Sequence, residues 1–382
     1  MKKLFSTLLI ISIMVMLFVY SNAGNQKSDP FNVLKQWEDA INKKDVNRYL
    51  EVFDEEMATG IKTAIENRKD KKNIQFYSLD SVKLINVIEI SEEIAKNVYP
   101  IYVNSGMAQK YLYLYYEGKT HENSKYTKDG ENFIICVMSK NKENKWVISQ
   151  FSCAPVQALI NNGITLGSHT EKEIKNNNVG IRTVYEVPEY IDVYLMSTLK
   201  YDGETNYQYW GVPKYTVQQI PLYTYIKDVL PNEWDCDIVV PDKYDESTKL
   251  YNALEAGAIM VKTFACYHVL YPWNPNIGAD VNDQNSQVYL HGTVNKLASD
   301  GTHGSSDKFE WGAMCEDAID DEGHHIIMNI QSYKPIFAHY NQDAQNETYR
   351  LDRDLHKNEE EIAKSIYVDY FREYPSYYIL IL

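Results

Sequence analysis

The stretch "ESTKLYNALEAGAIMVKTFACYHVL" (246–270) carries the most apolar helical pattern in the chain. Its apolar residues recur at helical spacing and form one stripe, made of Leu250, Leu254, Ala258, Val261, Ala265 and Val269. The small side chains of Ala256, Gly257 and Ala258 leave room for another element to come close. The pattern therefore predicts a long helix that a second element contacts closely.

The segment "IKDVLPNEWDCD" (226–237) precedes this helix and holds a carboxylate beside an indole. Its apolar run ends at Leu230, so we expect a helix that starts with Pro221 at its first position and stops at Pro231. Glu233 and Trp234 then follow directly after the helix. A glutamate packed on an indole in a dry cleft has a raised pKa, because burial disfavours the charged carboxylate. The alternative is a solvated carboxylate at a helix end.

Four pieces of the second half occur in a recognisable order. They are "YIKDVLPNEW" (225–234), "ALEAGAIMVKTFACY" (253–267), "SQVYLHG" (286–292) and "KPIFAHYNQ" (334–342). In order and spacing they resemble the sporulation stage II protein D family of peptidoglycan lytic transglycosylases, over about residues 185–350. The resemblance implies an α+β domain in which Glu233 is the catalytic acid and base. It also implies substrate contacts from Lys262, Gln287, Tyr289 and Tyr340.

The chain departs from the family pattern at several of these positions. Lys262 stands where the family has arginine, and Asn341 stands where it has histidine. The segment "ADVNDQNS" (279–286) lacks the Cys/His pattern with which some members hold zinc, so we expect no metal and no cofactor. The segment "QDAQ" (342–345) replaces a Ser-Gly-Gly loop, which implies remodelled loops around the substrate cleft.

A lytic transglycosylase needs only one carboxyl group, whereas a hydrolase usually needs two that flank the bond. The attacking group is the C6 hydroxyl of the substrate's own N-acetylmuramic acid, and intramolecular attack has a large proximity advantage. Glu233 would protonate the leaving glycosidic oxygen and then accept the proton of that hydroxyl. The product is a 1,6-anhydromuramoyl end.

Each of the other candidates also has a structural interpretation. Lys262 would hold a sugar or carboxylate, or it would extend from a helix flank into water. Gln287 and Tyr289 would bind N-acetyl groups, or they would form one face of a strand with Tyr289 in the core. Tyr340 would orient Glu233, or it would fill the core.

The first half predicts two helices within residues 30–53, followed by strands. The strand patterns cover 82–90, 95–105, 110–118, 132–140 and 145–153, with a hairpin turn at 141–144. This order resembles the NTF2-like fold, a curved antiparallel sheet packed on helices, over about residues 30–155. We find no acid–base pair suited to a cone-shaped pocket there, so we expect a spacer or a docking module for an envelope protein partner.

The N-terminal segment 1–23 has two lysines, an apolar run and small residues before a cleavage point. It predicts a signal peptide or an N-terminal anchor, and therefore a protein exported across a bacterial membrane. Membrane contact is expected only through this segment.

The polar stretch 156–180 is a predicted linker, and the second domain spans 181–382.

Charge and cysteine usage exclude other classes of protein. A formal net charge of −15 argues against nucleic-acid binding, which needs a basic face. The five cysteines are scattered, lack a C-x-x-C pair and do not form a disulfide framework; the register of a predicted hairpin does not place Cys136 opposite Cys153.

The cluster "DAIDDEGHH" (317–325) fits a hairpin turn better than a metal site. The C-terminal stretch 358–382 predicts an acidic helix followed by a paired strand.

Three functions remain open from the sequence. The first is a lytic transglycosylase acting on peptidoglycan glycan strands, and the second is a catalytically inactive peptidoglycan-binding or scaffold protein of the cell envelope. The third is an ordinary glycoside hydrolase in which Glu233 works with Asp235 or Asp237.

Overall fold

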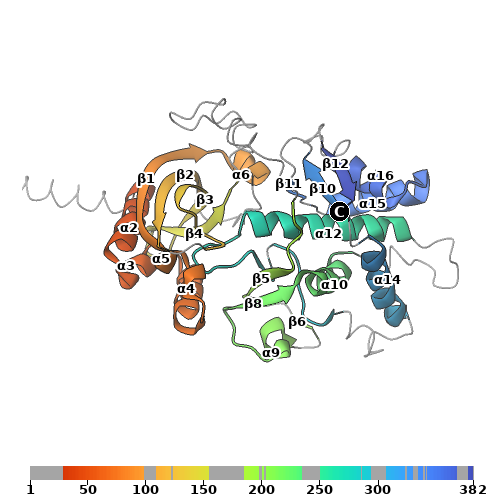
Figure 1. Ribbon diagram of the computed structural model, residues 1–382, viewed down its shortest axis with the longest axis horizontal. Coiled ribbons are helices and arrows are strands. Elements are labelled where there is room, and N and C mark those ends of the chain that lie inside the picture. The colour runs from red at the N-terminus through yellow and green to blue at the C-terminus, as the bar shows by residue number, and fades with distance from the viewer. Residues whose placement is uncertain are drawn as a thin grey trace, which may run out of the picture.

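The computed structural model describes two lobes of an α+β protein (Figure 1). The described residues are 29–98, 109–121, 124–154, 185–197, 200–201, 204–234, 250–284, 286–293, 307–322, 325–329, 334–338, 340, 342–367 and 377–381. We call residues 29–154 the N-terminal lobe and residues 185–381 the C-terminal lobe. The expected signal segment and linker lie outside the described residues.

Three helices open the N-terminal lobe, and each starts at an aspartate. They are α2 (Pro30–Lys43), α3 (Val46–Glu51) and α4 (Glu55–Asn67). The side chains of Asp29, Asp45 and Asp54 each accept a hydrogen bond from a first-turn backbone N–H, which satisfies an otherwise unpaired donor. The two helices expected within 30–53 are confirmed. Short helical turns follow at η1 (Lys71–Asn73) and α5 (Gln75–Ser78).

The sheet of this lobe is an antiparallel meander in the order β1-β2-β3-β4. Its strands are β1 (Leu79–Ile90), β2 (Gln109–Thr120), β3 (Gly130–Lys140) and β4 (Trp146–Cys153). Four of the five expected strands are thus confirmed. Cys136 pairs with Phe151 and Cys153 pairs with Ile134, so the two cysteines do not lie opposite each other, as predicted.

The strand expected at 95–105 is wrong in its first part. Residues Glu92–Val98 form helix α6, and 99–105 lie outside the described residues. Ser91 begins the helix, since its Oγ accepts from the N–H of Ile94, and Glu92 and Glu93 suit the positive end of the helix dipole. Local capping therefore overrides the β-branched composition of this stretch.

Both faces of the meander are buried, each against a different partner. Leu112, Leu114 and Cys136 point into a core shared with α2 and α4. Tyr111, Tyr113 and Ile135 point the other way, into a core shared with the C-terminal lobe. Since side chains alternate along a strand, the sequence "YLYLYY" supplies both cores at once. The sheet therefore lies between its own helices and the C-terminal lobe.

The C-terminal lobe surrounds one helix, α12 (Tyr251–Leu270), which crosses the lobe in Figure 1. One side of α12 faces a sheet with the strand order β8-β5-β9 and the helices α10 and α14. The other side faces a sheet with the strand order β11-β10-β12 and the helices α15 and α16. Strand bounds are β5 (Tyr190–Leu195), β8 (Thr216–Pro221), β9 (Val281–Asn282), β10 (His325–Asn329), β11 (Lys334–Pro335) and β12 (Tyr377–Ile381), with a small hairpin of β6 (Lys200–Tyr201) and β7 (Glu204–Thr205). The helices are α9 (Asn206–Trp210), α10 (Leu222–Glu233), α14 (Asp307–Glu322), α15 (Gln342–Leu355) and α16 (Glu359–Ser365).

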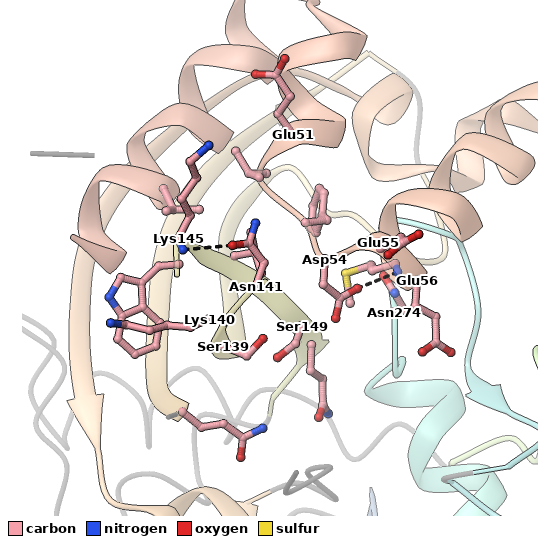
Figure 2. A pocket seen from close by; sticks show the side chains of 18 of the residues that line it. Glu51, Asp54, Glu55, Glu56, Ser139, Lys140, Asn141, Lys145, Ser149 and Asn274 are labelled. Atoms are coloured by element: carbon pink, nitrogen blue, oxygen red, sulfur yellow. Dashed lines mark hydrogen bonds between the residues drawn. The ribbon is translucent and has the colours of Figure 1, made fainter. Parts of the chain in front are cut away.

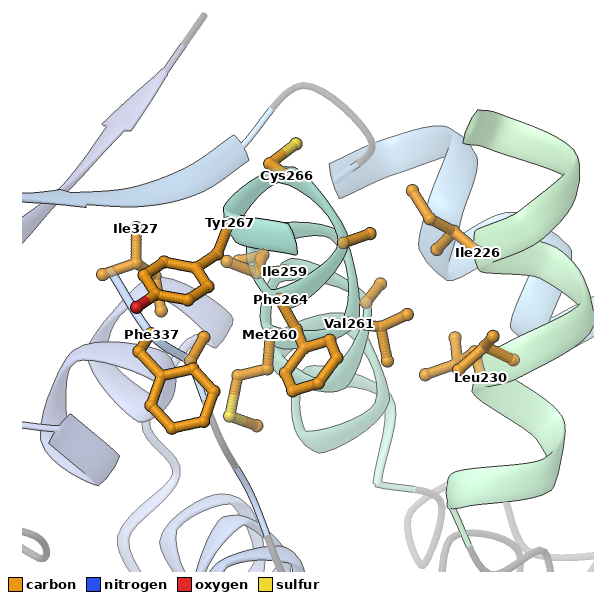
Figure 3. Packing of buried hydrophobic residues seen from close by; sticks show 14 of the residues in the cluster. Ile226, Leu230, Ile259, Met260, Val261, Phe264, Cys266, Tyr267, Ile327 and Phe337 are labelled. Atoms are coloured by element: carbon orange, nitrogen blue, oxygen red, sulfur yellow. The ribbon is translucent and has the colours of Figure 1, made fainter. Parts of the chain in front are cut away.

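Helix α12 is enclosed on all sides and is not a one-sided amphipathic helix. Its residues from Ala256 to His268 are all buried, and Figure 3 shows side chains leaving it in several directions toward α10 and toward Ile327 and Phe337. A helix that is apolar all round belongs in a core. Among the described residues, α12 is also the one helix long and apolar enough to cross a membrane, but here protein covers it.

Three local expectations for the C-terminal lobe are corrected. Pro231 does not end α10, which continues to Glu233, because a proline in the last turn removes only one of the final hydrogen bonds. The segment 342–345 starts helix α15 and is not a loop. Residues 317–322 end helix α14, so they do not form a hairpin. The predicted C-terminal helix and strand are confirmed as α16 and β12.

The segment 272–280 of the C-terminal lobe joins the two lobes. The N–H of Cys153 donates to the carbonyl of Pro272 at 3.0 Å, and the N–H of Gln75 donates to Pro275 at 3.1 Å. Tyr49 donates to Asn276 Oδ1 at 2.5 Å. Gly278 has a φ of 75°, and a Cβ there would lie 2.2 Å from the Asn73 carbonyl. These contacts make the lobes one packed body.

Candidate functional site

Glu233 occupies the last position of α10, where the chain is fixed from several sides. The side-chain amide of Asn232 donates to the Asp228 carbonyl at 2.6 Å and to Thr293 Oγ1 at 3.0 Å. The N–H of Trp234 closes the helix by donating to the Leu230 carbonyl at 3.0 Å. The helix end is therefore held both by its own hydrogen bonds and by the segment near Thr293.

The Glu233 carboxyl is half-buried and has one backbone donor. The N–H of Val288 donates to Glu233 Oε1 at 2.5 Å. Burial raises the pKa of the Glu233 carboxyl above its ordinary value, and the Val288 hydrogen bond acts in the opposite direction because it stabilises the anion. The net shift is upward, so burial is the larger effect.

The indole of Trp234 packs against the central helix. A Cβ at Gly257 would lie 2.6 Å from Trp234 Cε2, so the absence of a side chain at Gly257 admits the ring. The Trp234 ring also lies 5.1 Å from the ring of Tyr340. The close approach expected at residues 256–258 of α12 is therefore present, and Trp234 is the group that makes it.

Two tyrosines, Tyr225 and Tyr340, lie near the Glu233 carboxyl. The pKa values of the Tyr225 and Tyr340 hydroxyls are raised, first by burial and next by the nearby negative charge of Glu233. The predicted apolar surroundings of the carboxyl are thus supplied in part by two phenol rings, one from α10 and one from the segment after β11.

Gln287 joins these two tyrosines. Its Oε1 accepts from Tyr225 at 2.9 Å, and its Nε2 donates to Tyr340 at 2.8 Å and to the Val261 carbonyl at 3.4 Å. Only 2% of Gln287 is exposed. The structure therefore places Gln287 as a bridge that orients the tyrosines beside Glu233.

Tyr289 is fully buried next to this bridge. Its ring stacks on Tyr225 at 5.2 Å, and its hydroxyl lies 3.0 Å from His291 Nδ1. This is the core position that the sequence offered as the alternative role for Tyr289. The stretch 287–290 is not assigned to a strand, and the predicted alternation is incomplete because Tyr289 and Leu290 are both buried.

Two polar residues hold the segment that carries Val288. Asn206 donates to the Tyr289 carbonyl at 3.1 Å and accepts from the His291 N–H at 3.0 Å. Asp228 accepts from the Gly292 N–H at 2.8 Å. Neither residue was predicted from the sequence. A signal for Asp228 was its place within the apolar run that ends at Leu230, since a carboxylate buried with such a run needs a donor.

Lys262 lies on α12 and is also buried. Burial lowers the pKa of its ammonium, and Cys266, one turn further along the helix, acts in the opposite direction. The structure thus brings Glu233, Gln287, Tyr289 and Tyr340 together, and Lys262 lies buried on the neighbouring helix α12.

The described residues contain no group of three or more His, Cys, Asp or Glu side chains arranged to hold a metal ion. Within 279–286, the carboxylates have other partners. Asp280 accepts from Lys125 and from the Asp192 N–H. Asp283 accepts from the N–H groups of Met196 and Ser197 at 3.0 and 3.3 Å and from Asn206 at 3.0 Å.

Comparison with known proteins adds no family to this geometry: no family model, no curated protein and no solved structure matches the chain.

Proposed function

We propose that the protein is an exported peptidoglycan lytic transglycosylase in which Glu233 is the single general acid and base. The observation that carries this proposal is the half-buried Glu233 carboxyl, fixed by the Val288 N–H and bordered by Tyr225 and Tyr340. A general acid must hold its proton close to neutral pH, and burial of Glu233 favours the protonated form.

Positioning supports the same role. Glu233 ends a helix whose last turn is tied to Thr293 through Asn232, and the tyrosines beside it are bridged by Gln287. Such a carboxyl can meet a glycosidic oxygen with little loss of side-chain freedom. The attacking C6 hydroxyl belongs to the substrate, so no second carboxylate is required.

The second candidate is a peptidoglycan-binding scaffold protein without turnover. The burial of Gln287, Tyr289 and Lys262 favours it, because these residues have few polar atoms left to contact a glycan. In that case the Val288 hydrogen bond keeps Glu233 as a structural anion.

The decisive experiment is digestion of purified glycan strands by the full chain, with products weighed by mass spectrometry. We expect 1,6-anhydromuramoyl ends from the natural chain and none from Glu233→Gln, whose amide oxygen can still accept from Val288. Glu189→Gln is the matched control, because Glu189 is an exposed glutamate of the same lobe. Reducing ends would instead indicate a hydrolase, and co-sedimentation with glycan without products would indicate the scaffold.

A further inference from the structure

A large groove lies between the two lobes, away from Glu233. Its volume is about 1640 Å³, and its walls come from α2, α3, the start of α4, the β3–β4 hairpin and the C-terminal lobe near Tyr194 and Asn274. Small-molecule sites usually measure about 300–1,000 Å³, so this groove has room for a segment of a polymer.

One end of the groove concentrates negative charge. Asp54, Glu55 and Glu56 gather there at the start of α4, and Figure 2 shows them beside Asn274. Lys142 lies 3.8 Å from Glu55 at the exposed rim. Among the residues that the structure describes, neither Asp54 nor Glu56 forms an ion pair. Burial, with repulsion from Glu56 and Glu55, raises the pKa of Asp54 to about 6.

Two buried polar atoms from the C-terminal lobe line the groove and lack partners. Tyr194 Oη and Asn274 Nδ2 form no hydrogen bond within the described part of the chain, and the two residues are 2% and 0% exposed. The Tyr194 hydroxyl reaches α4, since a Cβ on Gly60 would lie 2.1 Å from it, and its pKa is raised by burial and then by Glu56. Buried polar atoms normally have partners, so these two point to a ligand.

The polar groups at the acidic end of the groove indicate which kind of ligand it would bind. The carboxylates of Asp54 and Glu56, which form no ion pair within the described part of the chain, and a phenol oxygen suit the three donors of a primary ammonium group. The Asn274 amide is a donor and suits a carbonyl oxygen close to that ammonium. An ammonium with a carbonyl two bonds further along is the amino-terminal residue of a peptide.

We propose that the groove between the lobes binds the free amino terminus of a peptide, with Asp54 and Glu56 receiving its ammonium and Asn274 donating to its first carbonyl. The proposal is independent of the proposed glycan chemistry, because none of its residues contacts Glu233. An amino sugar offers the ammonium without the neighbouring carbonyl and is the main competing ligand.

The test is isothermal titration of the full chain with alanyl-alanine amide, N-acetyl-alanyl-alanine amide and the disaccharide of glucosamine. We expect binding of the first probe and at least a tenfold weaker affinity for the other two. Asp54→Asn combined with Glu56→Gln should weaken the first probe at least tenfold, and asparagine at 54 still caps α4.

Glu66→Gln is the matched control, since Glu66 is an exposed glutamate of α4 outside the groove. This variant should bind alanyl-alanine amide with the same affinity as the natural chain. Thermal unfolding of each variant shows whether it folds. No binding of the free dipeptide, equal binding of the acetylated dipeptide, or tighter binding of the amino sugar would each overturn the proposal.

Discussion

The backbone N–H of Val288 lies 2.5 Å from Oε1 of Glu233, and this bond joins the end of α10 to the segment after β9. It fixes the carboxyl in place while acting against its protonation. Burial acts more strongly in the other direction, so the pKa of the Glu233 carboxyl is raised above its ordinary value. Glu233 is therefore held in position at a cost in stability at neutral pH.

That cost predicts a pH-dependent effect of Glu233→Gln. The pKa of Glu233 is higher in the folded than in the unfolded protein, so the folded state binds the proton more tightly. The penalty is absent below the unfolded pKa of about 4.3 and grows as the pH rises toward the folded pKa. Glu233→Gln should raise the melting temperature at pH 8 and leave it unchanged at pH 4. A variant less stable than the natural chain at pH 8 would contradict this.

Gly257 should tolerate no side chain while Trp234 occupies its position. Gly257→Ala places a methyl group 2.6 Å from the indole, which should cost about 1–3 kcal/mol in the free energy of unfolding. Urea denaturation of the two proteins measures this loss in the free energy of unfolding. Trp234→Leu removes the clash, so the alanine should cost less in that background than in the natural chain. Equal costs in both backgrounds would show that the ring is not the obstacle.

Lys125 should stabilise the junction of the lobes more than a surface lysine does. Its ammonium lies 3.2 Å from Asp192 and also pairs with Asp280, which is fully buried. Lys125→Met leaves a buried carboxylate with fewer partners and should cost about 3 kcal/mol. Lys128→Met is the control, because Lys128 lies on the same loop and forms no ion pair among the described residues, so its replacement should cost little. Chemical denaturation compares the two, and equal losses would reject the role of Lys125.

The hydroxyl of Tyr340 should contribute to stability through Gln287. Tyr340→Phe removes an acceptor 2.8 Å from Gln287 Nε2, and the remaining contact to the Val261 carbonyl at 3.4 Å is longer. We expect a loss of about 1 kcal/mol by thermal unfolding. Tyr190→Phe should have no effect, because Tyr190 is 46% exposed. No loss in Tyr340→Phe would mean that Gln287 finds another acceptor.

Much of the fold was predictable because its signals are local. Strand patterns predicted four strands of the meander, and the two helices within residues 30–53 were predicted as well. The wrong predictions fall where two local signals disagree, such as a helix cap within a strand-like pattern or a proline near the end of a helix. Ser91 and two glutamates turned an apparent strand into α6, and Pro231 lies within the last turn of α10 rather than ending it.

The arrangement of the candidate site residues could not be predicted from the sequence. The resemblance implied a set made of Glu233, Lys262, Gln287, Tyr289 and Tyr340. The structure brings four of these five together around Tyr225, namely Glu233, Gln287, Tyr289 and Tyr340. The sequence did not indicate that Trp234 would pack on Gly257, since neighbouring side chains along a chain need not point the same way.

The sequence by itself determined the α+β class, the apolar central helix and the identity of the acidic residue at the end of α10. Only the tertiary structure decided which groups surround that carboxyl and that both faces of the meander would be buried. It also decided that Tyr194 and Asn274 would meet the carboxylates of α4 in one groove. The physical reason is range: periodicity and capping depend on neighbours along the chain, whereas burial and hydrogen-bond partners depend on residues far apart in sequence that packing brings together.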